Sequence, residues 1–170
     1  MKITYNSTVI LTLGLLAGVV WCIDELMNLG IRGAYCTTYP YFDPRNFIDY
    51  LRLFSHVLGH ADWDHLAHNF LVILLVGPLV EAYYGSGNLL FMMAVTAVVT
   101  SVANIIFFNT GLMGASGIGY MLIIVGSFAG SKEYGEIPLT FLLVGALVFG
   151  GQVIDAWEQD NISQFAHIAG

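Results

Sequence analysis

The sequence predicts an all-α membrane protein whose helices form one bundle of six spans. Two observations support this prediction. Of the 170 residues, 57% are hydrophobic and only 10% are charged, whereas a soluble domain carries about 25% charged residues. In addition, long apolar runs recur along the chain, and a helix needs about 20 such residues to cross the hydrocarbon core of a bilayer.

Five spans and the beginning of a sixth are expected, in a single domain over residues 1–170. Their ranges are 7–28, 65–84, 88–108, 116–131, 137–153 and, incomplete, 163–170. The breaks between them have turn and loop compositions. The last eight residues would give about 12 Å of helix, whereas a span needs about 30 Å. We therefore expect a chain truncated within its sixth helix, which continues beyond Gly170.

The first apolar run is interpreted as an uncleaved span. Only one basic residue, Lys2, precedes it, and no convincing small-residue cleavage site follows it; a secretory signal is the alternative. The connection at 30–55 contains several Tyr and Phe residues, so we expect it to lie in or against the membrane interface. Cys22 lies in an apolar run and Cys36 in this connection, and two cysteines are too few for a disulfide framework.

The charge distribution narrows the possible partners. The net charge of −7 comes mostly from acidic residues in the connecting segments, which argues against a nucleic-acid partner. Lys and Arg residues fall on both sides of the expected membrane, so charge alone leaves the orientation open.

Four of the five histidines lie between residues 56 and 68, where the second span begins. At about 100° per residue, His65 and Asn69 are only about 40° apart on one helical face. Strongly polar groups in a span by default mark function. An imidazole and an amide aimed at one point could stabilise an oxyanion that appears only in a transition state.

Two other interpretations of the histidines remain open. His56/His60 and His65/His68 have plausible metal-ligand spacings, although no H-E-x-x-H arrangement and no nearby cysteine supports a metal site. Alternatively, His56 and His60 tie the second span to the preceding loop. His68 is assigned no role.

A serine opens the fourth span, in Gly114-Ala115-Ser116-Gly117. Small residues let helices pack closely, so a packing motif is one interpretation. However, backbone N–H groups at the start of a helix lack intrahelical partners, and together with the helix dipole they would stabilise an oxyanion beside the Ser116 hydroxyl. The pattern is not the G-x-S-x-G elbow of the α/β-hydrolases, because position 118 is Ile.

His167, in Ala166-His167-Ile168-Ala169-Gly170, is the candidate general base. A lone His in an apolar segment is often buried or lines a polar cavity, but with Ser116 available it could take the serine proton. No acidic residue lies near it in the span, so the pair would form a dyad. The ring of Tyr120, one turn beyond Ser116, could hold the imidazole by stacking.

These residues together resemble the rhomboid family of intramembrane serine proteases, over roughly residues 50–170. The matching pieces, in order, are His60-x4-His65-x3-Asn69, Gly114-x-Ser116-Gly117, Tyr120 and Ala166-His167-x-x-Gly170.

The resemblance implies a role for each of these residues. Ser116 would be the nucleophile and His167 the general base, and Tyr120 would support His167. The oxyanion hole would consist of His65, Asn69 and the Ser116 backbone N–H. Gly114 and Gly117 would support the serine.

The resemblance also implies an overall architecture and two further residues with structural roles. Arg52 together with Glu81 would brace the first loop against the second span. The family fold is a bundle of six transmembrane helices with a water-filled cavity that faces outward. Bacterial members of this minimal type keep the N-terminus in the cytoplasm, which implies the inner (plasma) membrane.

The sequence therefore predicts a serine endopeptidase that cleaves transmembrane protein substrates near the outer membrane face, in contact with the lipid bilayer and without metal or other cofactor. One alternative is a catalytically silent rhomboid-like protein that binds membrane clients, or an inactive truncated form. Another is a metal-dependent membrane protein or transporter that uses the histidines at 56–68.

The sequence also departs from the family pattern at two positions. Leu51 precedes Arg52 where Trp is usual, and His68 replaces an apolar residue near the substrate gate.

Overall fold

A computed structural model describes residues 5–134, 139, 142–143 and 146. Its elements are α1 (Thr8–Met27), α2 (Ile31–Tyr35), α3 (Phe47–Ser55), a 3-10 turn (His56–Leu58), α4 (Trp63–Tyr84), α5 (Ser86–Phe107) and α6 (Ser116–Tyr134). Within this described part the fold is all-helical, and a single antiparallel bridge joins Thr38 to Leu112.

The four long helices lie within three residues of the ranges expected for the first four spans. Three of them, α1, α4 and α5, are long and apolar enough to cross a membrane, and α6 has a shorter apolar part, Ser116–Phe128. The expected spans at 137–153 and 163–170, including His167, fall wholly or largely outside the described residues. The all-helical class predicted from the sequence is confirmed.

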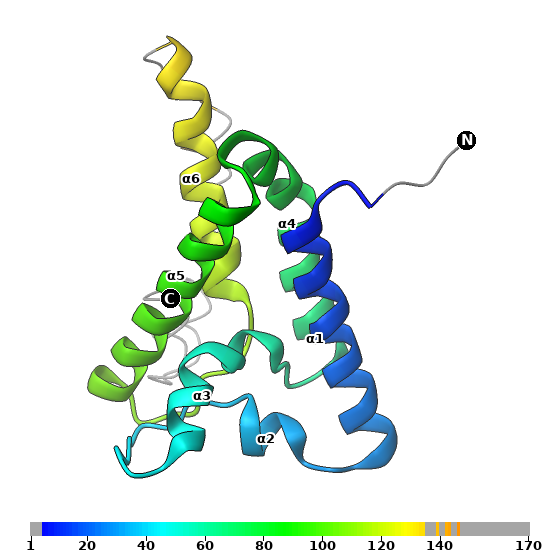
Figure 1. The fold of residues 1–170 in the computed structure, drawn as a ribbon, viewed down its shortest axis with the longest axis vertical. Coiled ribbons are helices and arrows are strands. Elements are labelled where there is room, and N and C mark those ends of the chain that lie inside the picture. The colour runs from blue at the N-terminus through cyan, green and yellow to red at the C-terminus, as the bar shows by residue number, and fades with distance from the viewer. Residues whose placement is uncertain (1–4, 135–138, 140–141, 144–145, 147–170) are drawn as a thin grey trace.

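Helix α4 contacts each of the other three long helices, α1, α5 and α6, and its most extensive contact is with α6 (Figure 1). Small residues allow these close approaches. A Cβ placed on Gly77 of α4 would lie 2.5 Å from Cδ1 of Ile10 in α1, and one placed on Gly126 of α6 would lie 3.2 Å from Cγ2 of Val80. A larger residue at Gly77 would force Ile10 to shift, and one at Gly126 would make a tight contact with Val80, so glycine favours close packing at both positions.

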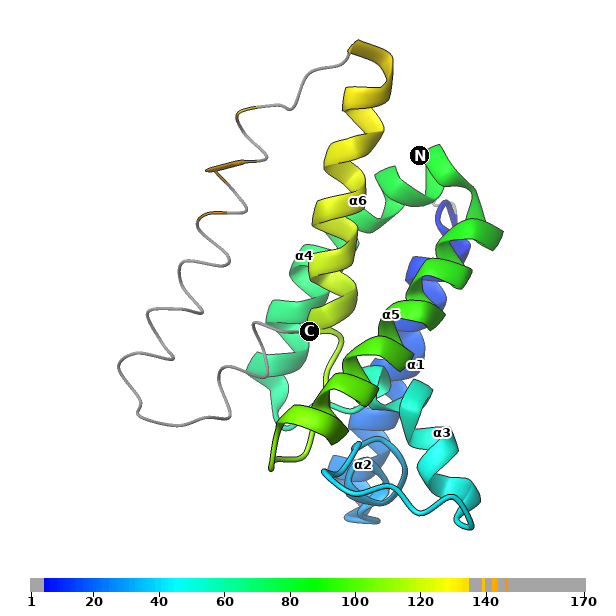
Figure 2. The ribbon, with the colours of Figure 1, turned by 90° about the vertical axis from the view of Figure 1, so that its left-hand side faces the viewer.

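The first loop contains two short helices, α2 and α3, which the sequence did not predict. They lie together at one end of the long helices, as Figure 2 also shows. Helix α3 is amphipathic. Its Asp49 is buried, whereas Phe47, Tyr50 and Phe54 are exposed on the outer surface. An exposed aromatic face is consistent with the interfacial position expected for this loop.

Candidate active site

Ser116 is the first residue of α6, and the chain turns sharply just before it. Gly114 has φ +121°, a conformation that L side chains rarely adopt, and Ala115 is fully buried. The first hydrogen bond of the helix runs from the N–H of Gly119 to the carbonyl of Ala115, at 3.0 Å. The N–H groups that precede Gly119 in α6, that of Ser116 included, therefore have no partner within the helix, as expected at a helix N-terminus.

His65 and Asn69, one turn apart on α4, pack directly against this turn. A Cβ placed on Gly114 would lie 2.7 Å from Nε2 of His65 and 3.3 Å from Nδ2 of Asn69. The missing side chain at Gly114 thus makes room for both polar groups, two residues before Ser116. The structure brings together the two donors that helical spacing had placed on one face.

The amide of Asn69 is an available donor at this position. Within the part of the chain that the structure describes, its buried Nδ2 has no hydrogen-bond partner. Buried polar groups are normally satisfied, so an exception requires an explanation. A substrate atom that arrives only during reaction is one such explanation.

His56 and His60 fix the turn that leads to Ser116. The carbonyl of His56 accepts a hydrogen bond from the Gly114 N–H at 2.9 Å, and Nε2 of His60 accepts one from the Ala115 N–H at 3.4 Å. The two side chains are 2% and 0% exposed, and this burial lowers the pKa of each imidazole to about 4. Both rings are therefore neutral at physiological pH, and the interpretation of His56 and His60 as structural residues agrees with these contacts.

A polar cluster on α5 supports His56 and was not found from the sequence. Its ring contacts Ser101 Oγ through Nδ1 at 3.0 Å and Thr100 Oγ1 through Nε2 at 3.3 Å. Ser101 Oγ also lies 3.0 Å from Thr38 Oγ1 in the first loop, and Asn104 donates to the Thr110 carbonyl at 3.0 Å. The sequence did contain a signal for this cluster: Thr100, Ser101 and Asn104 lie within about one turn of an apolar span, and polar residues there are costly unless they have partners.

Tyr120 and Gly117 lie on the side of α6 that faces α5. Tyr120 is buried, one turn after Ser116. Both residues line a groove of about 340 Å³ between the two helices. The remaining lining is mostly apolar, with Val95, Val99 and Met121 among its residues. The groove therefore begins beside the serine and runs along the apolar part of the span.

His68 is exposed at the start of α4. Its Nδ1 donates a hydrogen bond to the Asp64 carbonyl at 2.7 Å, within its own helix. No residue of the active-site turn is among these contacts, and His68 remains without an assigned role.

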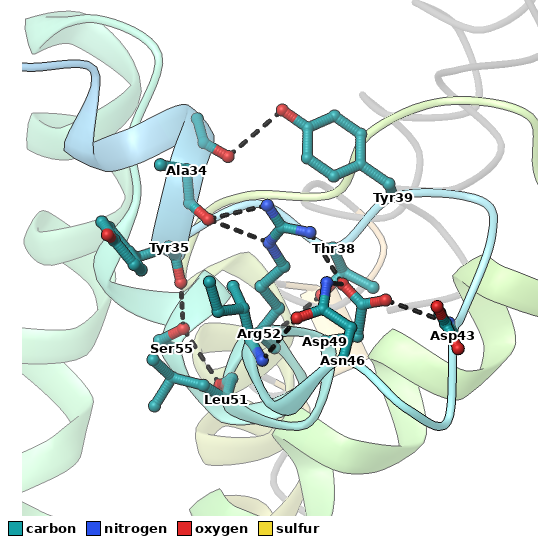
Figure 3. A network of polar contacts seen from close by, with 12 residues as sticks. Ala34, Tyr35, Thr38, Tyr39, Asp43, Asn46, Asp49, Leu51, Arg52 and Ser55 are labelled. Atoms are coloured by element: carbon teal, nitrogen blue, oxygen red, sulfur yellow. Dashed lines mark hydrogen bonds and ion pairs between the residues drawn. The ribbon is translucent and has the colours of Figure 1, made fainter.

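Arg52 braces the first loop but does not involve Glu81, contrary to the expectation from the resemblance. Figure 3 shows its guanidinium between α2 and the start of α3. It donates to the Ala34 carbonyl through Nε and Nη2, at 3.0 and 2.7 Å, and to Asp49 Oδ1 at 2.8 Å. It also lies 5.0 Å from the centre of the Tyr39 ring. Its partners are thus all local to the loop.

Glu81 has a different partner set, at the other end of α4. Its carboxylate accepts hydrogen bonds from Ser7 Oγ at 2.5 Å and from the N–H groups of Val9 and Ile10 at 3.0 and 3.2 Å. Ser86 Oγ donates a further bond at 2.7 Å. Glu81 therefore caps the start of α1, where unpaired N–H groups attract a carboxylate.

Two other features of the described residues bear on the alternatives. No group of three His, Cys, Asp or Glu residues there is arranged to hold a metal ion. Cys22 is exposed and Cys36 buried, and both are free thiols.

The fold and the site together define a class, namely an all-helical integral membrane protein that presents a serine at the start of a span, against polar groups of a neighbouring span. Comparison with known proteins gives the family. The family model described as the Rhomboid domain matches residues 48–170. The chain is also similar to the rhomboid protease GluP of Bacillus subtilis (strain 168), with 35% identity over 69 residues, or 41% of this chain. The chain belongs to the rhomboid family.

The resemblance to this family predicted from the sequence is confirmed. The matched segment covers only 14% of the Bacillus protein.

Proposed function

We propose that this protein is an intramembrane serine endopeptidase that cleaves transmembrane protein substrates. The observation that carries the proposal is the arrangement at Gly114. There, His65 meets the turn that leads to Ser116, together with the amide of Asn69, which has no hydrogen-bond partner among the described residues. Membership of the rhomboid family and similarity to a rhomboid protease support the same reaction class.

In the proposed reaction, the Ser116 hydroxyl attacks the scissile carbonyl of the substrate. The carbonyl oxygen becomes an oxyanion, which the Ser116 N–H, His65 and Asn69 stabilise by hydrogen bonds. Because these donors are held by packing before the substrate arrives, little reorganisation is needed in the transition state. The positive end of the α6 dipole adds to the stabilisation.

The proposal gives His167 the role of general base. It would take the proton of Ser116 as the serine attacks and return it to the leaving amine, after which water hydrolyses the acyl-enzyme. His167 lies outside the described residues, so this assignment rests on the sequence pattern. Tyr120 would support the imidazole, and its position on the groove one turn from Ser116 is compatible with that role.

The family pattern extends the proposal to the surroundings of the enzyme. Substrates would enter from the lipid bilayer and be cut near the outer membrane face. The active site would face outward from the bacterial inner membrane. Among the described residues, the polar groups of the site (His65, Asn69 and Ser116) lie at the starts of α4 and α6, next to the first loop, which is consistent with chemistry near one membrane surface (Figure 1).

Labelling with a fluorophosphonate tests the proposal directly. The full-length protein, reconstituted in liposomes, would be compared with Ser116→Ala and His167→Ala, and cleavage of a transmembrane substrate would be followed in parallel. We expect labelling and cleavage in the wild type and loss of both in each variant. A folded wild-type protein that neither labels at Ser116 nor cleaves would overturn the proposal and favour a client-binding role.

A further inference from the structure

We infer that Arg32 is a positioning residue for the active site. It fixes a segment of the chain that in turn holds Ser116 and the oxyanion donors in place. The inference rests on the proposed function and concerns a residue that touches none of the reacting groups. The segment is residues 59–62, between the 3-10 turn and α4, and it is called the linker segment below.

The Arg32 guanidinium binds the linker segment at two consecutive carbonyl groups. Its Nη1 donates to the carbonyls of His60 and Ala61, each at 3.0 Å. Gly59, at the start of the segment, packs so closely on Cys36, the residue that follows α2, that a Cβ there would lie 2.3 Å from the Cys36 carbonyl oxygen. The short helix α2 therefore holds the linker segment from its first residue to its third.

The guanidinium is itself held by a buried carboxylate. Arg32 Nε donates to Oδ2 of Asp24 at 2.7 Å, and Asp24 is only 6% exposed. Asp24 also accepts the N–H groups of Ile31 and Arg32, at 2.6 and 3.4 Å, which fixes the start of α2 on the end of α1. The carboxylate raises the pKa of the guanidinium, so its charge is constant at all relevant pH values. The contact is thus anchored to a spanning helix.

The linker segment reaches both halves of the site. His60 accepts the hydrogen bond of the Ala115 N–H, one residue before Ser116, and its ring lies 5.0 Å from the His65 ring in an edge-to-face arrangement. Asp62, at the end of the segment, caps α4 by accepting the His65 N–H at 2.7 Å. A shift of these residues would therefore move Ser116 and His65 relative to each other.

Arginine suits this role because its planar fork can bind the carboxylate and the carbonyls at once, whereas the single ammonium of lysine cannot cover the same set. A misplacement of about 1 Å at a catalytic group can cost roughly 100-fold in rate. We therefore expect Arg32→Lys to lower kcat about 10-fold to 100-fold, with KM nearly unchanged, because Arg32 does not line the groove beside Ser116.

The test uses the full-length protein in liposomes, with wild type, Ser116→Ala, Arg32→Lys and Arg32→Ala. Glu25→Gln is the matched control. Glu25 is 55% exposed and bonds only the outer nitrogen Nη2 of Arg32, at 2.9 Å, and exposed pairs of this kind contribute little. We expect wild-type kinetics in the control and slower labelling at Ser116 in both Arg32 variants. Hydrogen exchange at the Ala115 amide should quicken in the same two variants.

Each outcome decides the inference. Folded Arg32 variants that label and cleave at the wild-type rate would overturn it, even though the proposed function would stand. A wild type without Ser116-dependent labelling would overturn both. If neither Arg32 variant folds, Asp24→Asn decides, since it keeps the guanidinium but removes the charge of the carboxylate that holds it. Unchanged kcat and unchanged exchange at Ala115 in that variant would refute the positioning role.

Discussion

Replacement of Gly114 by alanine should disable the active site while leaving the bundle largely intact. The new Cβ would lie 2.7 Å from Nε2 and 2.8 Å from Cε1 of His65, and 3.3 Å from Nδ2 of Asn69. Side-chain carbons do not tolerate approaches below 3.0 Å, and 3.4 Å is the beginning of ordinary contact. His65 must therefore move by about 3.4 − 2.7 = 0.7 Å, or Gly114 must move away from it.

That displacement sets the expected loss of activity. A shift of about 1 Å at a catalytic group can cost roughly 100-fold, so 0.7 Å at an oxyanion donor should lower kcat/KM by between about 10-fold and 100-fold. The positive φ of Gly114 adds backbone strain, because a non-glycine residue in such a conformation costs about 1–3 kcal/mol. We therefore expect a modest loss of stability together with a large loss of fluorophosphonate labelling at Ser116.

Gly85→Ala separates the clash from the strain. Gly85 also has a positive φ, of +81°, but a Cβ there would have no atom within 4 Å, and it lies in the turn between α4 and α5. Its alanine variant should lose stability to a similar extent and still label at the wild-type rate. If Gly114→Ala labels and cleaves as fast as Gly85→Ala, His65 and Asn69 do not act at this turn.

Three further predictions concern stability. Burial lowers the pKa of His56 and His60 from 6.5 to about 4, so the unfolded chain binds more protons than the folded chain between these two pH values. The free energy of unfolding should therefore fall as the pH drops through this window, by up to about 3 kcal/mol per histidine. Unfolding in detergent at pH 7 and pH 4.5 measures this loss, and His56→Gln should make stability depend less on pH. Glu81→Gln should cost about 1–3 kcal/mol, since it weakens the charged acceptor at the start of α1, and it should not change the labelling rate. Gly77→Ala should destabilise by about 1–3 kcal/mol through its contact with Ile10, an effect that Ile10→Ala in the same chain should relieve in the unfolding assay.

The sequence predicted the long helices well because each follows from a local property. An apolar run of sufficient length bounded by turn residues is almost obliged to form a helix in lipid, since the backbone must satisfy its own polar groups. The short helices α2 and α3 do not follow from such a rule. Helix α2 has only five residues, too few to be stable alone, and it exists because Asp24 of α1 accepts the N–H groups at its start.

The same distinction explains which site residues could be predicted. His65 and Asn69 are four residues apart, so helical geometry alone places them on one face. The expectation that Arg52 and Glu81 together brace the first loop against the second span was wrong, because each charge binds a separate set of partners. Arg52 bonds to Ala34 and Asp49 within the first loop, whereas Glu81 binds the N–H groups of Val9 and Ile10 at the start of α1, 72 and 71 residues away in the chain. Which distant groups a charge meets depends on the packing of the bundle, which the sequence pattern does not encode.

The buried polar contacts around His56 help to keep the site ordered. A polar group inside a bundle is costly when unpaired, so His56 favours the one arrangement in which Ser101 and Thr100 meet its two ring nitrogens. In that arrangement its carbonyl also receives the Gly114 N–H. The need to keep these buried polar groups hydrogen-bonded thus couples the first loop, α5 and the turn before Ser116. Loss of the Ser101 hydroxyl would leave a ring nitrogen of His56 unpaired in an apolar setting, and the turn at Gly114 would lose definition although no catalytic group had been changed.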